Sequence, residues 1–167
     1  MLDIFTDGST KKNGSDESIG GYALVIMDDY DRVIDCYAEI NIPNTTNNRM
    51  ELTAILAATV LSRTIRYTEN IRIYTDSSYA MNCLTNWWNR WSMNNWYTSS
   101  GTPVKNKDII EKYLSLTWLD RKRKNIIPDI LYVPGHSGWL GNELADKLAT
   151  GEMTCEEVME KYGKKEN

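Results

Sequence analysis

The spacing of hydrophobic residues changes along the chain, and this change limits which folds the sequence can form. Leu2, Ile4 and Thr6 alternate with other residues, and the segments 20–28 and 32–42 are rich in strand-forming residues. Such patterns predict β-strands. A polar loop and a charged turn separate the three segments, so we expect a three-stranded antiparallel meander.

A helical spacing then begins and leads into a further strand. Residues 45–65 place apolar side chains three and four positions apart, behind Thr and Asn residues that favour helix starts. The apolar run 71–75 predicts a strand parallel to the first, because strand–helix–strand is the usual crossover unit. The remaining pattern predicts a helical projection and loop at 87–106, helices at 107–120 and 142–150, and a fifth strand at 129–135.

Length and charge describe one globular domain with an acidic balance. The chain has 167 residues, 23 acidic and 19 basic side chains and a net charge of −4. This size buries an adequate core without disulfides or structural metals. The balance disfavours a protein that coats nucleic acid through bulk charge. The charge is local, however, since residues 79–126 hold eight basic and three acidic side chains, which is compatible with a nucleic-acid partner.

The cysteines and the N-terminus indicate a cytoplasmic protein. Three cysteines stand more than forty residues apart, which suits neither a disulfide framework nor a metal knuckle. The N-terminus carries Asp3 and Asp7 where a signal peptide needs a basic start and an apolar stretch. We therefore expect no membrane association. No protein partner is implied, so we expect a monomer.

Four carboxylates occupy positions that can converge. Asp7 and Asp76 each end a predicted strand, and the carboxyl ends of parallel strands share one edge of a sheet. Glu51 lies one turn into the long helix and Asp146 near the start of the last helix, so both can point at this edge. Taken singly, each aspartate equally fits a turn former or helix cap, and Glu51 a solvated helix residue.

Together, the four carboxylates predict a metal site. Converging carboxylates repel one another unless cations neutralise them. Oxygen ligands without a His or Cys cluster favour Mg²⁺, with Mn²⁺ as the alternative, and a pair of such ions suits displacement at a phosphodiester. The residues alone therefore predict a two-metal phosphoryl-transfer site.

Six segments, in this order, resemble the type 1 ribonucleases H: TDGS (6–9), GGY (20–22), TTNNRMEL (45–52), TDSSY (75–79), a Trp-rich stretch leading to PVKN (103–106), and GHSGWLGNELADKLA (135–149). The resemblance implies an α/β ribonuclease H-like fold, with a five-stranded mixed sheet of three antiparallel and two parallel strands and helices on both faces. It also implies hydrolysis of the RNA strand of RNA–DNA hybrids. We expect a catalytic domain at 1–150 and a polar tail or short helix at 151–167.

The resemblance assigns roles to individual residues. Asp7, Glu51, Asp76 and Asp146 match the family's four metal-binding carboxylates, where two Mg²⁺ ions activate the attacking water and stabilise the leaving 3′ oxygen. His136 matches the family's mobile-loop histidine, which assists proton transfer or product release. Without the resemblance, a solvated loop histidine is the plainer interpretation.

The same resemblance suggests substrate contacts. Thr46, Asn47 and Asn48 match contacts to the minor groove and backbone of the hybrid, although a helix cap explains such residues equally well. Asn13 is a candidate contact to a DNA phosphate, but the family's Gly-Asn-Pro-Gly type of loop is replaced by the partly acidic residues 11–17.

Two tryptophans in the projection complete the expected interface. Trp87 and Trp91 resemble the family's handle, a projection that reaches across the hybrid. Aromatic residues four positions apart in a helix are more often packing residues, and we expect Trp87 to lie largely in the core.

Two other functions stay open from the sequence. One is a related nuclease with another nucleic-acid substrate. The other is a non-catalytic hybrid-binding or assembly protein, which four carboxylates disfavour because a pure binder gains nothing from negative charge facing phosphates.

Overall fold

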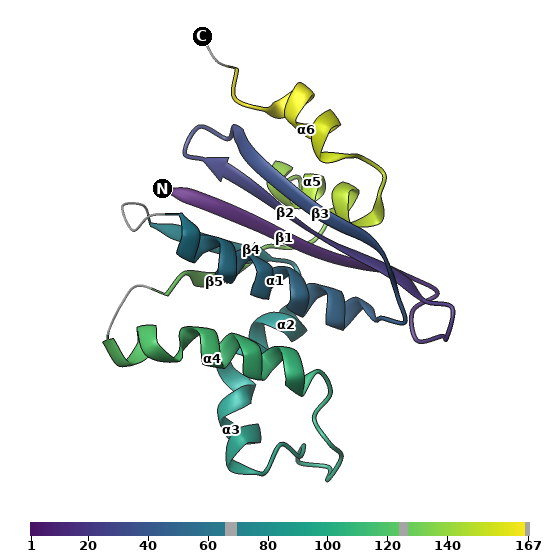
Figure 1. The fold of residues 1–167 in the computed structure, drawn as a ribbon, viewed down its shortest axis with the longest axis vertical. Coiled ribbons are helices and arrows are strands. Elements are labelled where there is room, and N and C mark those ends of the chain that lie inside the picture. Colours follow the sequence, from purple (N-terminus) through teal and green to yellow (C-terminus); the bar gives the residue numbers. More distant parts are fainter. Residues whose placement is uncertain (66–69, 124–126, 166–167) are drawn as a thin grey trace.

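A five-stranded mixed sheet forms the centre of the computed structural model (Figure 1), which describes residues 1–65, 70–123 and 127–165. The strand order is β3-β2-β1-β4-β5. The first three strands are antiparallel, and β4 and β5 run parallel to β1. The predicted sheet is therefore confirmed. Its strands are β1 Leu2–Lys11, β2 Ile19–Asp28, β3 Val33–Pro43, β4 Ile71–Thr75 and β5 Asp129–Tyr132.

Helices cover both faces of the sheet and enclose two cores. On one face, Ile4 of β1 packs in a cluster with Leu52 and Ile55 of α1. On the other, Phe5 packs with Leu144 and Leu148 of α5. Alternate residues of β1 thus serve opposite cores. The helices are α1 Asn47–Thr64, α2 Ser78–Asn82, the π-helical turn η1 Cys83–Trp87, α3 Trp88–Met93, α4 Lys107–Arg123, α5 Leu140–Thr150 and α6 Cys155–Tyr162.

The first strand extends past its predicted end. The sequence places the end of this strand at Asp7, whereas β1 continues to Lys11 because β2 pairs with it from Asp7↔Ala23 to Lys11↔Ile19. β4 pairs with β1 only as far as Thr6↔Thr75. Asp7 is therefore not a strand terminus. It lies where β1 loses its neighbour on one side and keeps the other.

Two other boundaries also differ from the expected ones. The last strand, β5, ends at Tyr132 instead of residue 135. The helix that carries Asp146 starts at Leu140, two residues earlier than predicted, so Asp146 lies in its second half. The apolar pattern misses this start because only Leu140 is apolar among the first three residues. Gly141 and Asn142 give no signal of helical periodicity.

The segment after α5 forms α6 and packs on the sheet. Thr154 caps this helix by accepting a hydrogen bond from the Glu157 amide at 3.2 Å. Val158 is fully buried in the core beneath α5, and Gly163 forms a bridge with Val33 of β3. Among the described residues, no helix has the length and apolar character needed to cross a membrane.

Candidate metal centre

The position of Glu51 depends on a close approach between α1 and β1. A Cβ atom on Gly8 would lie 2.3 Å from the Glu51 amide nitrogen, a contact far closer than any that Cβ atoms make in real proteins. Glycine at this position therefore allows the first turns of α1 to lie against β1, beside Asp7. Glu51 is 8% exposed and Asp7 is 5% exposed.

Asp76 follows β4 directly and is free of the capping role that its position suggests. Ser77 caps α2 instead, since its hydroxyl accepts a hydrogen bond from the Ala80 amide at 3.1 Å. The Asp76 carboxylate accepts a hydrogen bond at 3.3 Å from the side-chain amide of Asn142 in α5. Asn142 is 3% exposed, and its side-chain oxygen has no hydrogen-bond partner.

Sequence reasoning did not single out Asn142. It stands four residues before Asp146 in the segment GNELAD, one helical turn away on the same face of α5. That spacing is the signal that points to it.

Three of the four predicted carboxylates form one tight group. One oxygen each from Asp7, Glu51 and Asp76 lie within 4.8 Å of one another. Asp146 stands outside this group, as judged over the described residues, although its charge acts on Asp7. The structure thus brings together side chains from β1, α1 and the end of β4, and holds Asp146 next to them on α5.

Burial and mutual repulsion raise the pKa values of carboxyl groups in this cluster. Burial, followed by the charges of Asp76 and Asp146, raises the pKa of Asp7 to about 8. Burial and then the charge of Asp7 raise the pKa of Glu51 well above its usual range. Desolvation and like charges both disfavour ionised carboxyl groups, so the protein alone does not satisfy this site.

A divalent cation fits these residues. The donors are all carboxylate oxygens, which suit hard ions, and one Glu51 oxygen is buried without a hydrogen-bond partner. An uncompensated buried acceptor next to two further carboxylates is the arrangement that a bound cation would complete. The cluster therefore can hold a divalent metal ion.

His136 lies in the loop between β5 and α5 and is exposed. Its backbone has a φ of 53°, a left-handed conformation in which Asn, Asp and His are enriched among the residues other than glycine. The loop leads directly into α5, which carries Asn142 and Asp146.

The polar residues before Glu51 combine capping and exposed positions. Thr46 is the N-cap of α1 and accepts a hydrogen bond from the Arg49 amide at 3.2 Å. Asn47 and Asn48 open the helix and are exposed. The side-chain oxygen of Asn13 accepts a hydrogen bond from the Asn47 amide at 3.1 Å, so Asn13 ties the β1–β2 loop to α1.

The burial of the tryptophans in the projection differs from the prediction. Trp87 is 38% exposed, so the expectation that it lies largely in the core is wrong. Trp88 takes the packed position instead, and Trp91 also packs partly against the core. The reason is η1, which ends at Trp87: a π-helical turn holds more residues than an α-helical turn, and it rotates the faces of the next helix, α3. Trp87 contacts Tyr79 and Trp91, with ring centroids 6.1 and 5.7 Å apart.

The sequence matches the model of the family described as RNase H over residues 1–154, which is most of the chain. The chain belongs to the RNase H family. The predicted resemblance is therefore confirmed, and the acidic cluster lies within the part of the chain that the RNase H match covers.

Bacterial relatives named ribonuclease H cover nearly the full length of this RNase H chain. The protein from Clostridium botulinum strain Hall is 36% identical over 157 residues, which is 90% of this chain and 93% of the relative. The protein from Ehrlichia ruminantium strain Gardel is 35% identical, with 90% and 92% covered, and that from Treponema denticola is 31% identical, with 95% and 99% covered.

Solved structures share the RNase H fold at lower identity. The solution structure of the PFV RNase H domain has a TM-score of 0.71 and 21% identity, and covers 90% of this chain and 92% of that one. LC11-RNase H1 in complex with an RNA/DNA hybrid has a TM-score of 0.62 and 18% identity, with 95% and 99% covered.

Proposed function

We propose that this ribonuclease H is an endonuclease that hydrolyses the RNA strand of RNA–DNA hybrids with the help of two Mg²⁺ ions. The observation that carries the proposal is the buried group of Asp7, Glu51 and Asp76 at the end of β4, in a chain of the RNase H family. A related RNase H1 whose structure contains an RNA/DNA hybrid supports this choice of substrate.

Asp7, Glu51 and Asp76 would hold the metal ions, with Asp146 completing the set from α5. When bound, the ions supply Lewis-acid activation of water and stabilise negative charge at the phosphodiester. Mn²⁺ is the alternative ion, since it accepts the same oxygen ligands.

The chain's own residues orient the carboxylates and move protons. Asn142 fixes one Asp76 oxygen by a hydrogen bond. Water adds to the phosphorus and gives up one proton, the bond between phosphorus and the 3′ oxygen breaks, and the 3′ oxygen takes up one proton. We assign to His136, which is exposed on the loop that leads into α5, the relay of this proton or assistance in product release.

The polar start of α1 and the neighbouring rings of Trp87 and Trp91 are the proposed substrate contacts. Thr46, Asn47 and Asn48 offer hydroxyl and amide groups that suit a 2′-hydroxyl, which both donates and accepts. The rings of Trp87 and Trp91 lie 5.7 Å apart between centroids, and the Trp87 ring is exposed, so it can contact a sugar or base. Asn13 acts through its bond to Asn47 and so shapes this surface.

A purely binding protein is the poorer alternative. A buried carboxylate group whose pKa values are raised destabilises the metal-free fold and repels phosphates, and a protein that only binds hybrids gains nothing in return. We propose that the enzyme acts as a monomer in the cytoplasm, where the three cysteines, all free, would remain reduced.

A substrate panel tests this function. Labelled RNA–DNA hybrid, double-stranded RNA, double-stranded DNA and single strands are incubated with the protein in Mg²⁺, in Mn²⁺ and in EDTA. We expect cleavage of the RNA strand of the hybrid alone, with either metal and not in EDTA. Cleavage that persists in EDTA, or a hybrid left intact in both metals, would contradict the proposal.

A further inference from the structure

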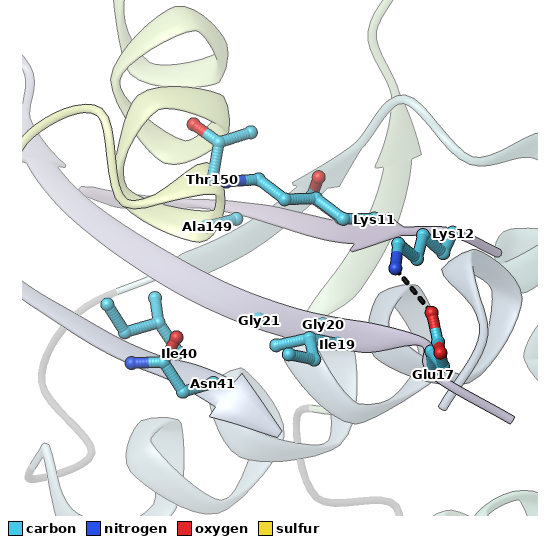
Figure 2. A pocket seen from close by; sticks show the side chains of 11 residues that line it. Lys11, Lys12, Glu17, Ile19, Gly20, Gly21, Ile40, Asn41, Ala149 and Thr150 are labelled. Carbon is cyan, nitrogen blue, oxygen red and sulfur yellow. Dashed lines mark hydrogen bonds and ion pairs between the residues drawn. The ribbon is translucent and has the colours of Figure 1, made fainter. Parts of the chain in front are cut away.

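A pocket lies between the end of α5 and the ends of β1, β2 and β3 (Figure 2), with a volume of about 260 Å³. Its floor is apolar and includes Gly21, where a Cβ would lie 2.4 Å from the Ala149 carbonyl oxygen. Glycine there lets the last turn of α5 lie on the sheet. The polar lining consists of Ser9, Lys11, Lys12, Glu17, Asn41 and Thr150.

The pocket lies farther along β1 and α5, the two elements that carry Asp7 and Asp146. In an antiparallel pair, opposite residues share a face, and Asp7, Ser9 and Lys11 pair with Ala23, Gly21 and Ile19. Ala23 belongs to the core under α5, so these β1 side chains all stand on the α5 face. Lys11 is four residues beyond Asp7, about 13 Å along the strand. Thr150 is likewise four residues beyond Asp146 on α5.

Lys12 and Asn13, which follow Lys11, already have side-chain partners. Lys12 forms an ion pair with Glu17, and Asn13 accepts from the Asn47 amide. Lys11, by contrast, has no ion pair or hydrogen bond from its side chain among the described residues. Figure 2 shows it extending from β1 toward Thr150, away from the Lys12–Glu17 pair.

The charge of the pocket follows from these pairings. Lys12 and Glu17 cancel each other, which leaves the pocket a net charge of +1 from Lys11. The Thr150 hydroxyl donates to the Asp146 carbonyl at 2.9 Å. A single cation beside hydroxyl and amide groups matches a phosphodiester, which offers one negative charge and several acceptors.

We propose that Lys11 and this pocket bind one backbone phosphate of the nucleic-acid substrate, within a few nucleotides of the bond that is cut. The inference rests on the proposed function and deepens it, because it names a contact that fixes the register of the strand on the enzyme.

The first test compares Lys11→Ala with Lys161→Ala in steady-state hybrid cleavage. Lys161 lies in α6, whose end pairs with the start of β3, whereas the pocket lies at the other end of that strand. We expect Lys11→Ala to raise KM on the order of three- to tenfold, leave kcat within about twofold, and reduce the slope of log(kcat/KM) against log[salt] by about one. Lys161→Ala should match the wild type.

The second test locates the contact. Hybrids that carry one uncharged methylphosphonate at successive positions are cleaved by the wild type and by Lys11→Ala. One position should raise KM for the wild type and have no further effect in the variant, since both changes remove the same contact.

Three possible results distinguish a failure of the phosphate-binding pocket from a failure of the proposed function. An unchanged KM and salt slope in Lys11→Ala, while the wild type cleaves hybrids, would overturn the pocket and leave the function standing. A lowered thermal midpoint with an unchanged salt slope would likewise overturn it, because Lys11 would then serve only the carbonyl end of α5. A wild type that cleaves no hybrid would remove the proposed function itself.

Discussion

The fold holds the Asp7 carboxyl group in an unfavourable environment. It is almost fully buried, next to Glu51 and Asp76, and its pKa is raised to about 8 by burial and by neighbouring carboxylates. In the metal-free protein this arrangement opposes folding whenever the group is ionised. The structure therefore keeps a locally unfavourable cluster, as binding and catalytic sites often do.

The raised pKa of Asp7 predicts how stability depends on pH without metal. The folded state holds its proton up to about pH 8, whereas the unfolded chain releases it near its ordinary value of 3.8. The unfolded state therefore binds fewer protons between these values, and stability falls as pH rises through this window. Thermal melts in EDTA from pH 5 to pH 8.5 should show this fall, and Asp7→Asn should flatten it.

Added Mg²⁺ provides the control for that melt. A cation neutralises the ionised cluster, so the thermal midpoint at pH 8 should rise with Mg²⁺ in the wild type and rise much less in Asp7→Asn. A wild-type midpoint that increases with pH in EDTA would contradict the assignment.

His136 predicts a slower but surviving enzyme. It is exposed on its loop and is not part of the carboxylate group, so His136→Ala should lower kcat on the order of 100-fold and leave the Mg²⁺ dependence unchanged. Single-turnover and steady-state rates on the hybrid measure this. Full loss of activity, or a shifted Mg²⁺ midpoint, would instead make His136 part of the metal site.

At the scale of elements, the site depends on strands of unequal length. β1 continues past the end of β4, with α1 packed on one face of the sheet and α5 on the other. Hydrophobic periodicity and chain order predicted the strands, and which of them are antiparallel and which parallel. They could not predict that β1 continues past Asp7, because an alternating pattern does not reveal which neighbour a strand keeps.

The handle illustrates a second limit of sequence patterns. Regular helical spacing assigned Trp87 to the core, but η1 changes the phase and turns Trp88 inward. A π-helical turn leaves no mark in hydrophobic spacing, so only the structure reveals the exchange. Asp76 was predictable because it directly follows β4 and does not depend on that phase, whereas Asp7 and Asp146 lie inside β1 and α5.

This exchange predicts opposite effects for two neighbouring variants. Trp88→Ala removes a packed ring and should lower the free energy of unfolding by about 3 kcal/mol, with little change in KM once folded. Trp87→Ala should leave the thermal midpoint nearly unchanged and raise KM for the hybrid. Equal effects of the two variants on stability would contradict the assignment of faces.

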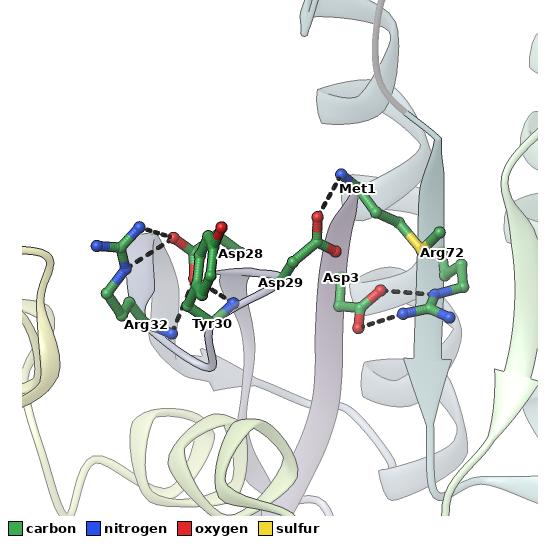
Figure 3. A network of polar contacts seen from close by, with 7 residues as sticks. All are labelled: Met1, Asp3, Asp28, Asp29, Tyr30, Arg32 and Arg72. Carbon is green, nitrogen blue, oxygen red and sulfur yellow. Dashed lines mark hydrogen bonds and ion pairs between the residues drawn. The ribbon is translucent and has the colours of Figure 1, made fainter.

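The opposite end of the sheet offers a variant that separates stability from catalysis. Arg72 of β4 donates to Asp3 of β1 at 2.7 and 2.8 Å, beside the Asp28–Arg32 pair and the Met1–Asp29 contact (Figure 3). The Arg72 and Asp3 side chains are partly exposed, so Asp3→Ala should lower the free energy of unfolding in urea by at most about 1 kcal/mol. Its kcat should equal that of the wild type, and a loss of kcat would mean that this end of the sheet reaches the site.

Over the whole molecule, acidic composition and a nucleic-acid substrate are compatible because charge is distributed unevenly. The site concentrates negative charge that divalent ions would cancel, while residues 79–126 carry most of the basic excess. Hybrid binding should therefore need metal and weaken with salt.

The decisive measurement is cleavage of labelled RNA–DNA hybrid in Mg²⁺ by Asp7→Asn beside the wild type. The substitution keeps the size of the side chain and removes one charge from the cluster, so the variant should remain folded in EDTA and be at least as stable as the wild type at pH 8. Its cleavage rate should fall by about 1,000-fold or more, because bound metal contributes several kcal/mol to such reactions. A folded Asp7→Asn protein that cleaves the hybrid at the wild-type rate would contradict the assignment of this cluster as the catalytic metal centre.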